Sequence, residues 1–390
     1  MFYLAGMKVG ALGVDTFFVL SAYLLTMIFE KKLRALYTER APLTRWLLAL
    51  VDYGVRRVLR VYPLFAVVVL VISVSSDKHK QQWWEVSKLG DDFSAFKMLT
   101  FVPGYRFYVL WTLPLELTYY LLIPVFALAM VLLRCAWWLP IIPLLYWIIH
   151  SGLYDFRTAG GPLWSQHIPT FVCGSVAAIL YNRTSELLKK HKFVFRWWHL
   201  IVVRAIEVGT LLLLVSVVFD ALIFDWYGPY PYKTSQNGDK GDHFVSVYIS
   251  LIIICEMLAP GVISAVFEWN VLRFAGKISF SMYLLHPRII HSDFLRDQKN
   301  WYTKYFSLWI LVFFWSTLSF YAIEYPSQWV AAWISKKIKA LDAKEKAKSQ
   351  HFFPVFCRKT QSPEPEGPLT PDVEPLKRES DTRRRSTGVQ

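Results

Sequence analysis

A glutamate stands in the middle of one of the most apolar stretches of this chain. Glu116 lies within VLWTLPLELTYYLLIPVFALAMVLL, residues 109–133, which is long enough to cross a bilayer as a helix. A carboxylate at that depth costs roughly 2.5–3.5 kcal/mol on insertion scales, so the protein interior is expected to use it. Glu116 is therefore a candidate catalytic residue. The alternative is that Glu116 only hydrogen-bonds a neighbouring helix and holds two helices together.

Three arginines crowd the entrance of another apolar segment. They occur in RRVLRVYP, residues 56–63, where Arg56 and Arg60 are four residues apart and share one helix face with Arg57 beside them. Guanidinium groups bind phosphate through charge-assisted hydrogen bonds, which makes a phosphate-bearing ligand one interpretation. The other is that these arginines are ordinary positive anchors at the cytosolic surface.

Further ionisable residues fall within or at the ends of apolar segments, among them Asp15, His167, His286 and Glu324. His286, in FSMYLLHPR, lies one turn from the end of its segment and suits either a base or a packed histidine. Buried groups of this kind also form proton relays in transporters, which is the rival functional class. Sequence patterns for phosphate loops, zinc proteases, dinucleotide folds and hydrolase elbows do not occur, and the four scattered cysteines predict no metal site.

Composition predicts the elements that must position these residues. Hydrophobic residues make up 55% of the 390 residues and mean hydropathy is +0.33, which predicts an all-α, multi-pass membrane protein embedded in a lipid bilayer. The net charge of +14 lies in connections and the tail, so we expect no nucleic-acid partner. Nine apolar segments are expected to span the membrane: 9–29, 61–75, 109–133, 136–150, 164–182, 199–222, 244–267, 275–291 and 304–326.

Basic residues predict the orientation. The 30–60 and 183–198 connections are rich in Lys and Arg and should be cytosolic, which also places the C-terminus in the cytosol. Alternation over nine segments then leaves Met1 outside, as if one helix were missing upstream. Residues 1–335 are expected to form the transmembrane domain, and residues 336–390 a basic, Pro- and Ser-rich cytosolic tail that is mostly disordered.

Five blocks of sequence, in order, carry a resemblance. GVDTFFVLSAYLL (13–25), RRVLRVYP (56–63), LWTLPLELTYYLLIP (110–124), GKISFSMYLLHP (276–287) and AIEYP (322–326) resemble the signature blocks of the acyltransferase-3 family of integral-membrane acyltransferases. The resemblance implies a ten-helix bundle that moves an acetyl or other short acyl group from acyl-CoA to a hydroxyl of a glycan or lipid. No bound cofactor is expected, because acetyl-CoA or another acyl-CoA is a co-substrate.

The resemblance also implies roles for individual residues. Arg57 and Arg60 match the family's arginines before the proline, which favours donor phosphates over anchoring for the cluster with Arg56. Glu116 and His286 match its glutamate and histidine, which we expect to act as an organising carboxylate and as a second base or acceptor-site residue. Acceptor contacts or structural roles are expected for five further residues, namely Asp15, Ser21, Trp111, His167 and Glu324.

Two departures from the family's pattern stand out. Ala22 occupies a position that is usually glycine, which should narrow a helix contact. The family's first helix also carries an arginine and the presumed catalytic histidine, and the sequence starts after the position expected for that helix. An inactive, truncated acyltransferase-like protein is therefore a further alternative.

Overall fold

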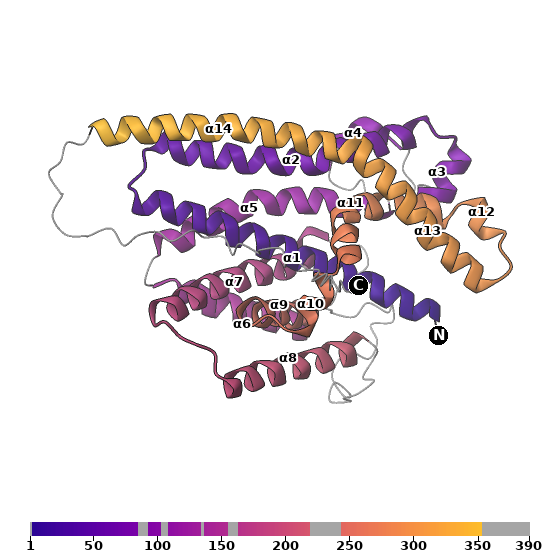
Figure 1. The fold of residues 1–390 in the computed structure, drawn as a ribbon. Coiled ribbons are helices and arrows are strands. Elements are labelled where there is room, and N and C mark those ends of the chain that lie inside the picture. The colour runs from indigo at the N-terminus through magenta and orange to yellow at the C-terminus, as the bar shows by residue number, and fades with distance from the viewer. Residues whose placement is uncertain are drawn as a thin grey trace, which may run out of the picture. The chain divides into compact units, whose positions relative to one another are not determined.

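The protein is built of helices. The computed structural model describes residues 2–84, 93–102, 108–133, 136–154, 163–218 and 243–352, and these contain no strand, as the all-α prediction requires. Figure 1 shows the elements, which are α1 (Phe2–Thr38), α2 (Leu43–Val74), α3 (Asp77–Trp84), α4 (Ala95–Leu99), η2 (Tyr108–Trp111), α5 (Thr112–Leu132), α6 (Trp138–Tyr154), α7 (Leu163–Lys190), α8 (Trp197–Val218), α9 (His243–Leu258), α10 (Val262–Phe267), α11 (Asn270–Ile290), α12 (Asp293–Arg296), α13 (Trp301–Ser319), η4 (Phe320–Glu324) and α14 (Tyr325–Phe352).

The helices are long and apolar enough for an integral membrane protein. Five stretches of the described chain meet the length and hydropathy of a membrane span: Leu12–Thr38, Leu43–Val74, Val109–Leu132, Trp197–Ser216 and Trp301–Lys348. Two shorter apolar helices, Trp138–Ser151 and Val245–Leu258, accompany them. Large apolar side chains face outward on these helices, for example Leu121 and Val125 of α5, as a lipid-facing surface requires.

Several predicted boundaries differ from the structure. Helix α2 begins at Leu43, so most of the basic 30–60 segment is helical and only residues 39–42 connect α1 to α2. The segment 244–267 is interrupted between α9 and α10, where Pro260 lacks the N–H that a continuous helix needs. Helix α14 crosses the expected domain boundary at 335/336, and residues 353–390 of the predicted tail lie outside the described chain.

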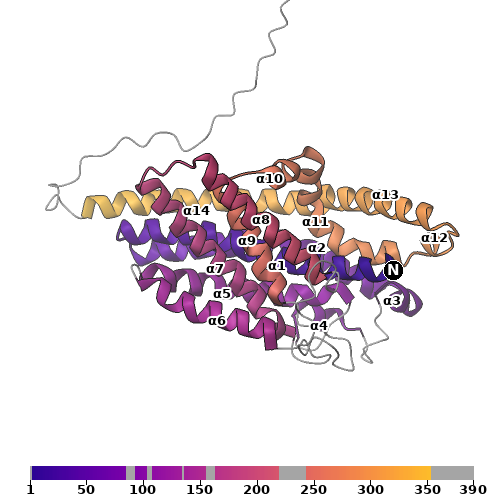
Figure 2. The same ribbon diagram turned by 90° about the horizontal axis from the view of Figure 1, so that it is seen from below.

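Helix α1 is the centre of the packing. It contacts α7, α5 and α9, while α8 packs on the outer side of α9 (Figures 1 and 2). A Cβ atom on Gly174 of α7 would lie 2.4 Å from the carbonyl oxygen of Val19 and 3.1 Å from the Cβ atom of Ala22. The side chain that Ala22 adds on α1 is therefore accommodated because α7 has a glycine opposite it.

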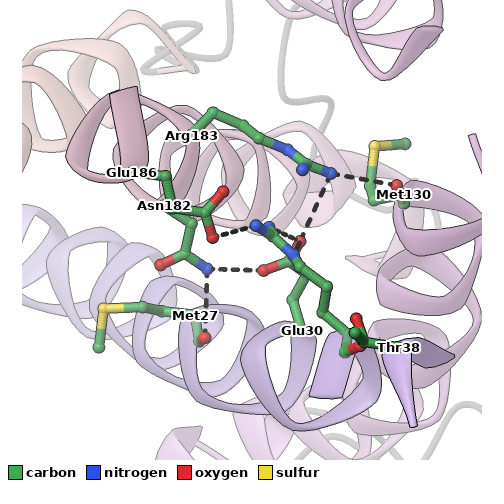
Figure 3. A network of polar contacts seen from close by, with 8 residues as sticks. Met27, Glu30, Thr38, Met130, Asn182, Arg183 and Glu186 are labelled. Atoms are coloured by element: carbon green, nitrogen blue, oxygen red, sulfur yellow. Dashed lines mark hydrogen bonds and ion pairs between the residues drawn. The ribbon is translucent and has the colours of Figure 1, made fainter. Parts of the chain in front are cut away.

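A buried glutamate joins α1 to α7. Glu30, which is fully buried, accepts hydrogen bonds from Asn182 at 2.9 Å and from Arg34 at 3.1 Å (Figure 3). Arg183 lies 3.7 Å from the same carboxylate, and Arg34 also pairs with Glu186. The carboxylate is stabilised inside the bundle because two guanidinium groups and an amide surround it.

A second polar cluster joins α14 to the turn between α1 and α2. Arg45 Nε donates to Asp342 at 2.6 Å, and another nitrogen of Arg45 donates to Glu39 at 2.7 Å. Lys346 donates to the other oxygen of Glu39 at 2.8 Å. These bonds place α14 along α2, as Figure 1 shows.

Candidate functional site

Glu116 is held in the interior by a tyrosine of its own helix. Its side chain is buried on α5, and the Tyr120 hydroxyl, one turn later, donates to the carboxylate. The Ser21 hydroxyl of α1 lies 3.4 Å from the same tyrosine hydroxyl. Tyr53 of α2 donates to the Tyr120 main-chain carbonyl at 3.0 Å, so three helices fix the position of this carboxylate.

Two of the three predicted arginines lie beside Glu116. Arg57 and Arg60, on α2, are both within electrostatic range of the Glu116 carboxylate. The Nε atom of Arg57 is buried and has no hydrogen-bond partner among the described residues. Neither arginine forms an ion pair within the part of the chain that the structure describes. Both guanidinium groups therefore keep donors for an anion.

Arg56 has different surroundings. It pairs with Asp52 at 3.1 Å, one turn earlier on α2, and donates to the Ser335 hydroxyl of α14. Ser335 in turn donates to Asp52. Arg56 thus contributes to the contact between α2 and α14, whereas Arg57 and Arg60 are within electrostatic range of interior carboxylates.

A second buried carboxylate approaches Arg60. Glu324 is the last residue of a π-helical turn, η4, and only 1% of its surface is exposed. The Ser281 hydroxyl of α11 donates to it, and Arg60 is within electrostatic range. A π-turn widens the helix by one residue and occurs often at functional sites. Here it presents Glu324 to the site rather than to lipid.

Glu116, His286 and Trp111 line one cavity. Its volume is about 710 Å³, within the range of roughly 300–1,000 Å³ usual for small-molecule sites, and α1, η2, α5 and α11 form its walls. His286 Nδ1 lies 2.7 Å from the carbonyl oxygen of Tyr283. Because a carbonyl only accepts, Nδ1 carries the proton, and a neutral His286 has its lone pair on Nε2, as a base requires.

Asp15 and His167 form a buried pair behind this cavity. Their closest carboxylate and imidazole atoms are 3.7 Å apart, and both side chains are almost fully buried. The imidazole lies against Phe18 at 5.6 Å and Trp111 at 5.1 Å between ring centroids, and both of these aromatic residues line the cavity. Asp15 and His167 therefore support the aromatic wall instead of lining the cavity themselves.

Four hydroxyl groups of the site were not predicted from the sequence. Tyr120 and Ser281 donate to Glu116 and Glu324. Tyr53 and Tyr283 donate to the main-chain carbonyls of Tyr120 and Val109. Only Tyr120 had a local signal, because its spacing of four from Glu116 places both on one helix face. Among the described residues, no group of His, Cys, Asp or Glu side chains has a metal-binding arrangement. The charged groups at hand suit anion binding and proton transfer.

Comparison with known proteins agrees with the sequence blocks. A protein of Staphylococcus aureus strain MRSA252, named as a "putative O-acetyltransferase", is 27% identical over 384 residues, covering 90% of this chain and 56% of the relative. The peptidoglycan O-acetyltransferase OatA of Listeria monocytogenes is 25% identical over 321 residues, covering 73% of this chain and 45% of that protein. The chain thus spans about half the length of the curated relatives it matches.

No solved structure matches this chain significantly. The profile of the acyltransferase-3 family, described as an acyltransferase domain, matches residues 2–325. That match includes every helix that contributes to the Glu116 cavity and the neighbouring arginines. With most of its length covered, the chain belongs to the acyltransferase-3 family.

Proposed function

We propose that this protein is an O-acetyltransferase that moves an acetyl group from acetyl-CoA to a hydroxyl of a glycan or lipid acceptor. The observation that carries the proposal is the pair Arg57 and Arg60, whose donors are not used by ion pairs with described residues although both lie beside Glu116. The names of the relatives support O-acetyl transfer as the reaction class.

The arginines suit the phosphates of coenzyme A. A guanidinium binds phosphate through two parallel charged hydrogen bonds, and the unsatisfied Nε of Arg57 is an available donor. We assign the same role to Arg60 and a lesser one to Arg56, since Asp52 and Ser335 already engage Arg56. The basic residues near the α1–α2 turn favour a cytosolic position for this end of the bundle and for the C-terminus, where acetyl-CoA is available.

The cavity supplies the groups that the transfer needs. His286 Nε2 takes the proton of the acceptor hydroxyl as the acceptor oxygen attacks the thioester carbonyl. The carbon–sulfur bond of the resulting adduct then breaks, and the imidazolium of His286 returns this proton to the departing coenzyme A sulfur. Glu116 acts as the organiser, since it fixes the Tyr120 hydroxyl and lies beside the donor-binding arginines. Trp111 and the other aromatic wall residues, supported by Asp15 and His167, provide a surface for the acceptor.

Donor binding tests the proposal directly. Replacing Arg57 and Arg60 together with Gln should weaken acetyl-CoA binding more than about tenfold, because each charged hydrogen bond contributes roughly 1.5–3 kcal/mol. Arg56→Gln is the matched control on the same helix turn and should have a much smaller effect. Binding is measured on purified protein, alongside transfer of labelled acetyl to membrane glycans and lipids. Unchanged binding in a folded double variant would return both arginines to the anchor interpretation.

A further inference from the structure

A second cavity lies on the opposite side of α11 from the candidate active site. Its volume is about 490 Å³, and it is lined by Leu285, Arg288, Ile289, Ser292, Phe294, Leu311 and Trp315. His286 and Tyr283, which line the Glu116 cavity, are not among its walls. Helix α11 therefore separates two cavities, and the second is apolar apart from one arginine and one serine.

Arg288 is placed where a lipid headgroup would meet the protein. It lies in the last turn of α11, before the polar segment HSDFLRDQKN, residues 291–300, and this change from apolar to polar sequence is typical of a membrane interface. Below it, the crevice between α11 and α13 is walled by Leu285, Ile289 and Leu311. Phe294 and Trp315, which also line it, are 64% and 49% exposed, so the crevice opens toward the lipid.

The Arg288 guanidinium is fixed but keeps its hydrogen-bond donors. Its centre lies 3.2 Å from the ring centroid of Trp83 on α3, a stacking contact that uses the face of the guanidinium and leaves its N–H edges available. No ion pair to Arg288 is found among the described residues. The neighbouring carboxylate, Asp293, is already bound by Gln82 at 2.8 Å and Arg296 at 2.6 Å.

We propose that this crevice binds one anionic phospholipid, with the headgroup phosphate on Arg288 and Ser292 and an acyl chain against Ile289 and Leu311. Charge complementarity selects this occupant, because the formal charge found among the described lining residues is the positive charge of Arg288, and the walls below it are apolar. The lipid would fill the gap between α11 and α13 without entering the Glu116 cavity. The site is independent of the proposed acetyl transfer.

Lipid retention on the purified full chain tests the site. The protein is titrated in a nonionic detergent with phosphatidylglycerol or phosphatidylcholine, and bound lipid is counted by native mass spectrometry. We expect one phosphatidylglycerol to be preferred, and Arg288→Gln to weaken its binding about tenfold, since one charged hydrogen bond is lost. Lys299→Gln, which removes an exposed cation of the 291–300 segment and leaves the Asp293 contacts intact, is the matched control and should keep the preference.

A second variant tests the chain-binding part of the crevice. Leu311→Trp fills the apolar wall and leaves Arg288 intact, so it should also reduce phosphatidylglycerol retention, with thermal unfolding used to verify the fold. An equal loss in Arg288→Gln and Lys299→Gln would indicate general surface attraction and overturn the proposal. Full retention in Leu311→Trp would show that no acyl chain occupies the crevice, which would also overturn it.

Discussion

Helix α2 carries arginines in two different electrostatic settings. Arg45 is held by Glu39 and Asp342, and Arg56 by Asp52 and Ser335, so both connect α2 to neighbouring segments. Arg57 and Arg60 lie on the same helix beside buried carboxylates, yet neither has an ion-pair partner within the described residues. Arginines a few positions apart on one helix therefore differ in whether an ion pair with a described residue engages their charge.

Paired and unpaired arginines serve different purposes, since the first hold helices together and the second can bind a ligand. A charged group with a matched partner fixes the relative position of two helices, whereas a buried donor without a partner costs about 1–3 kcal/mol. The Nε atom of Arg57 carries that cost in this structure. A bound phosphate would remove this cost by accepting the hydrogen bond. For this reason we assign acetyl-CoA binding to Arg57 and Arg60 and not to Arg45 or Arg56.

Removing the Glu116 charge should have the largest effect on chemistry. Glu116→Gln keeps the size of the side chain but loses the carboxylate that organises Tyr120, and we expect turnover to fall about 100-fold, as for loss of an acid–base group. Donor affinity should be unchanged or tighter, because a negative charge near Arg57 and Arg60 disappears. Turnover and acetyl-CoA affinity are measured separately.

A buried glutamate elsewhere provides the control for this variant. Glu207 of α8 pairs with Arg204 and does not line the Glu116 cavity. Turnover per folded molecule should therefore be normal in Glu207→Gln. If Glu116→Gln lost donor affinity and kept its turnover, Glu116 would belong to the binding site and the assigned roles would be reversed.

Removing a paired arginine should instead affect stability. Arg45→Gln breaks the charged hydrogen bonds to Asp342 and Glu39, and we expect the free energy of unfolding to fall by about 2 kcal/mol, the scale of one such bond. Thermal unfolding in detergent measures the change. Lys348→Gln, which removes an exposed pair with Glu345, should change stability by roughly 0.5 kcal/mol or less. Weaker acetyl-CoA binding in Arg45→Gln would contradict the distinction between the paired arginines, Arg45 and Arg56, and the proposed ligand-binding pair, Arg57 and Arg60.

Much of the fold could be predicted from the sequence. Each of the nine apolar segments is mainly helical in the part that the structure describes, although 244–267 is divided between α9 and α10, because membrane length and apolar composition leave a chain few alternatives. The helix boundaries were less predictable. Nothing local shows that α2 continues from Leu43 through the basic turn, or that α14 continues to Phe352, since amphipathic and charged helices extend beyond the bilayer without an apolar signal.

The residues of the candidate site were proposed from the sequence, whereas their hydrogen-bond partners could not be. The five sequence blocks indicated Glu116, His286 and the arginines, and Glu116 and His286 do share a cavity. Their hydrogen-bond partners come from distant segments, as with Ser281 for Glu324, and no spacing reveals such contacts. The spacing of Arg56 and Arg60 suggested a common face, but Asp52 and the tertiary contact with Ser335 give Arg56 different surroundings.

The paired cluster at Arg45 should also show a modest pH dependence. Hydrogen bonds from Lys346 and Arg45 lower the pKa of Glu39 below its ordinary value of 4.5. A lowered folded-state pKa stabilises the protein above pH 4.5, and this contribution is lost as the pH falls toward the folded-state pKa. Because Glu39 is about one-third exposed, we expect roughly 0.5 kcal/mol. Unfolding curves of wild type and Glu39→Gln should converge at low pH, and a constant difference would exclude this linkage.

No N-glycosylation is expected at Asn182, which is the smallest change among these predictions. Asn182-Arg183-Thr184 is a glycosylation sequon, and the basic residues of the 183–198 segment predict that it faces the cytosol, on the side where acetyl-CoA would reach Arg57 and Arg60. Asn182 is also fully buried, with its amide donating to Glu30 and to the Met27 carbonyl (Figure 3). Protein expressed in a glycosylating host should show no glycosidase-sensitive mass shift. A shift that disappears in Asn182→Gln would show that the predicted orientation is wrong. Arg57 and Arg60 would then no longer be expected on the side of the membrane that holds acetyl-CoA.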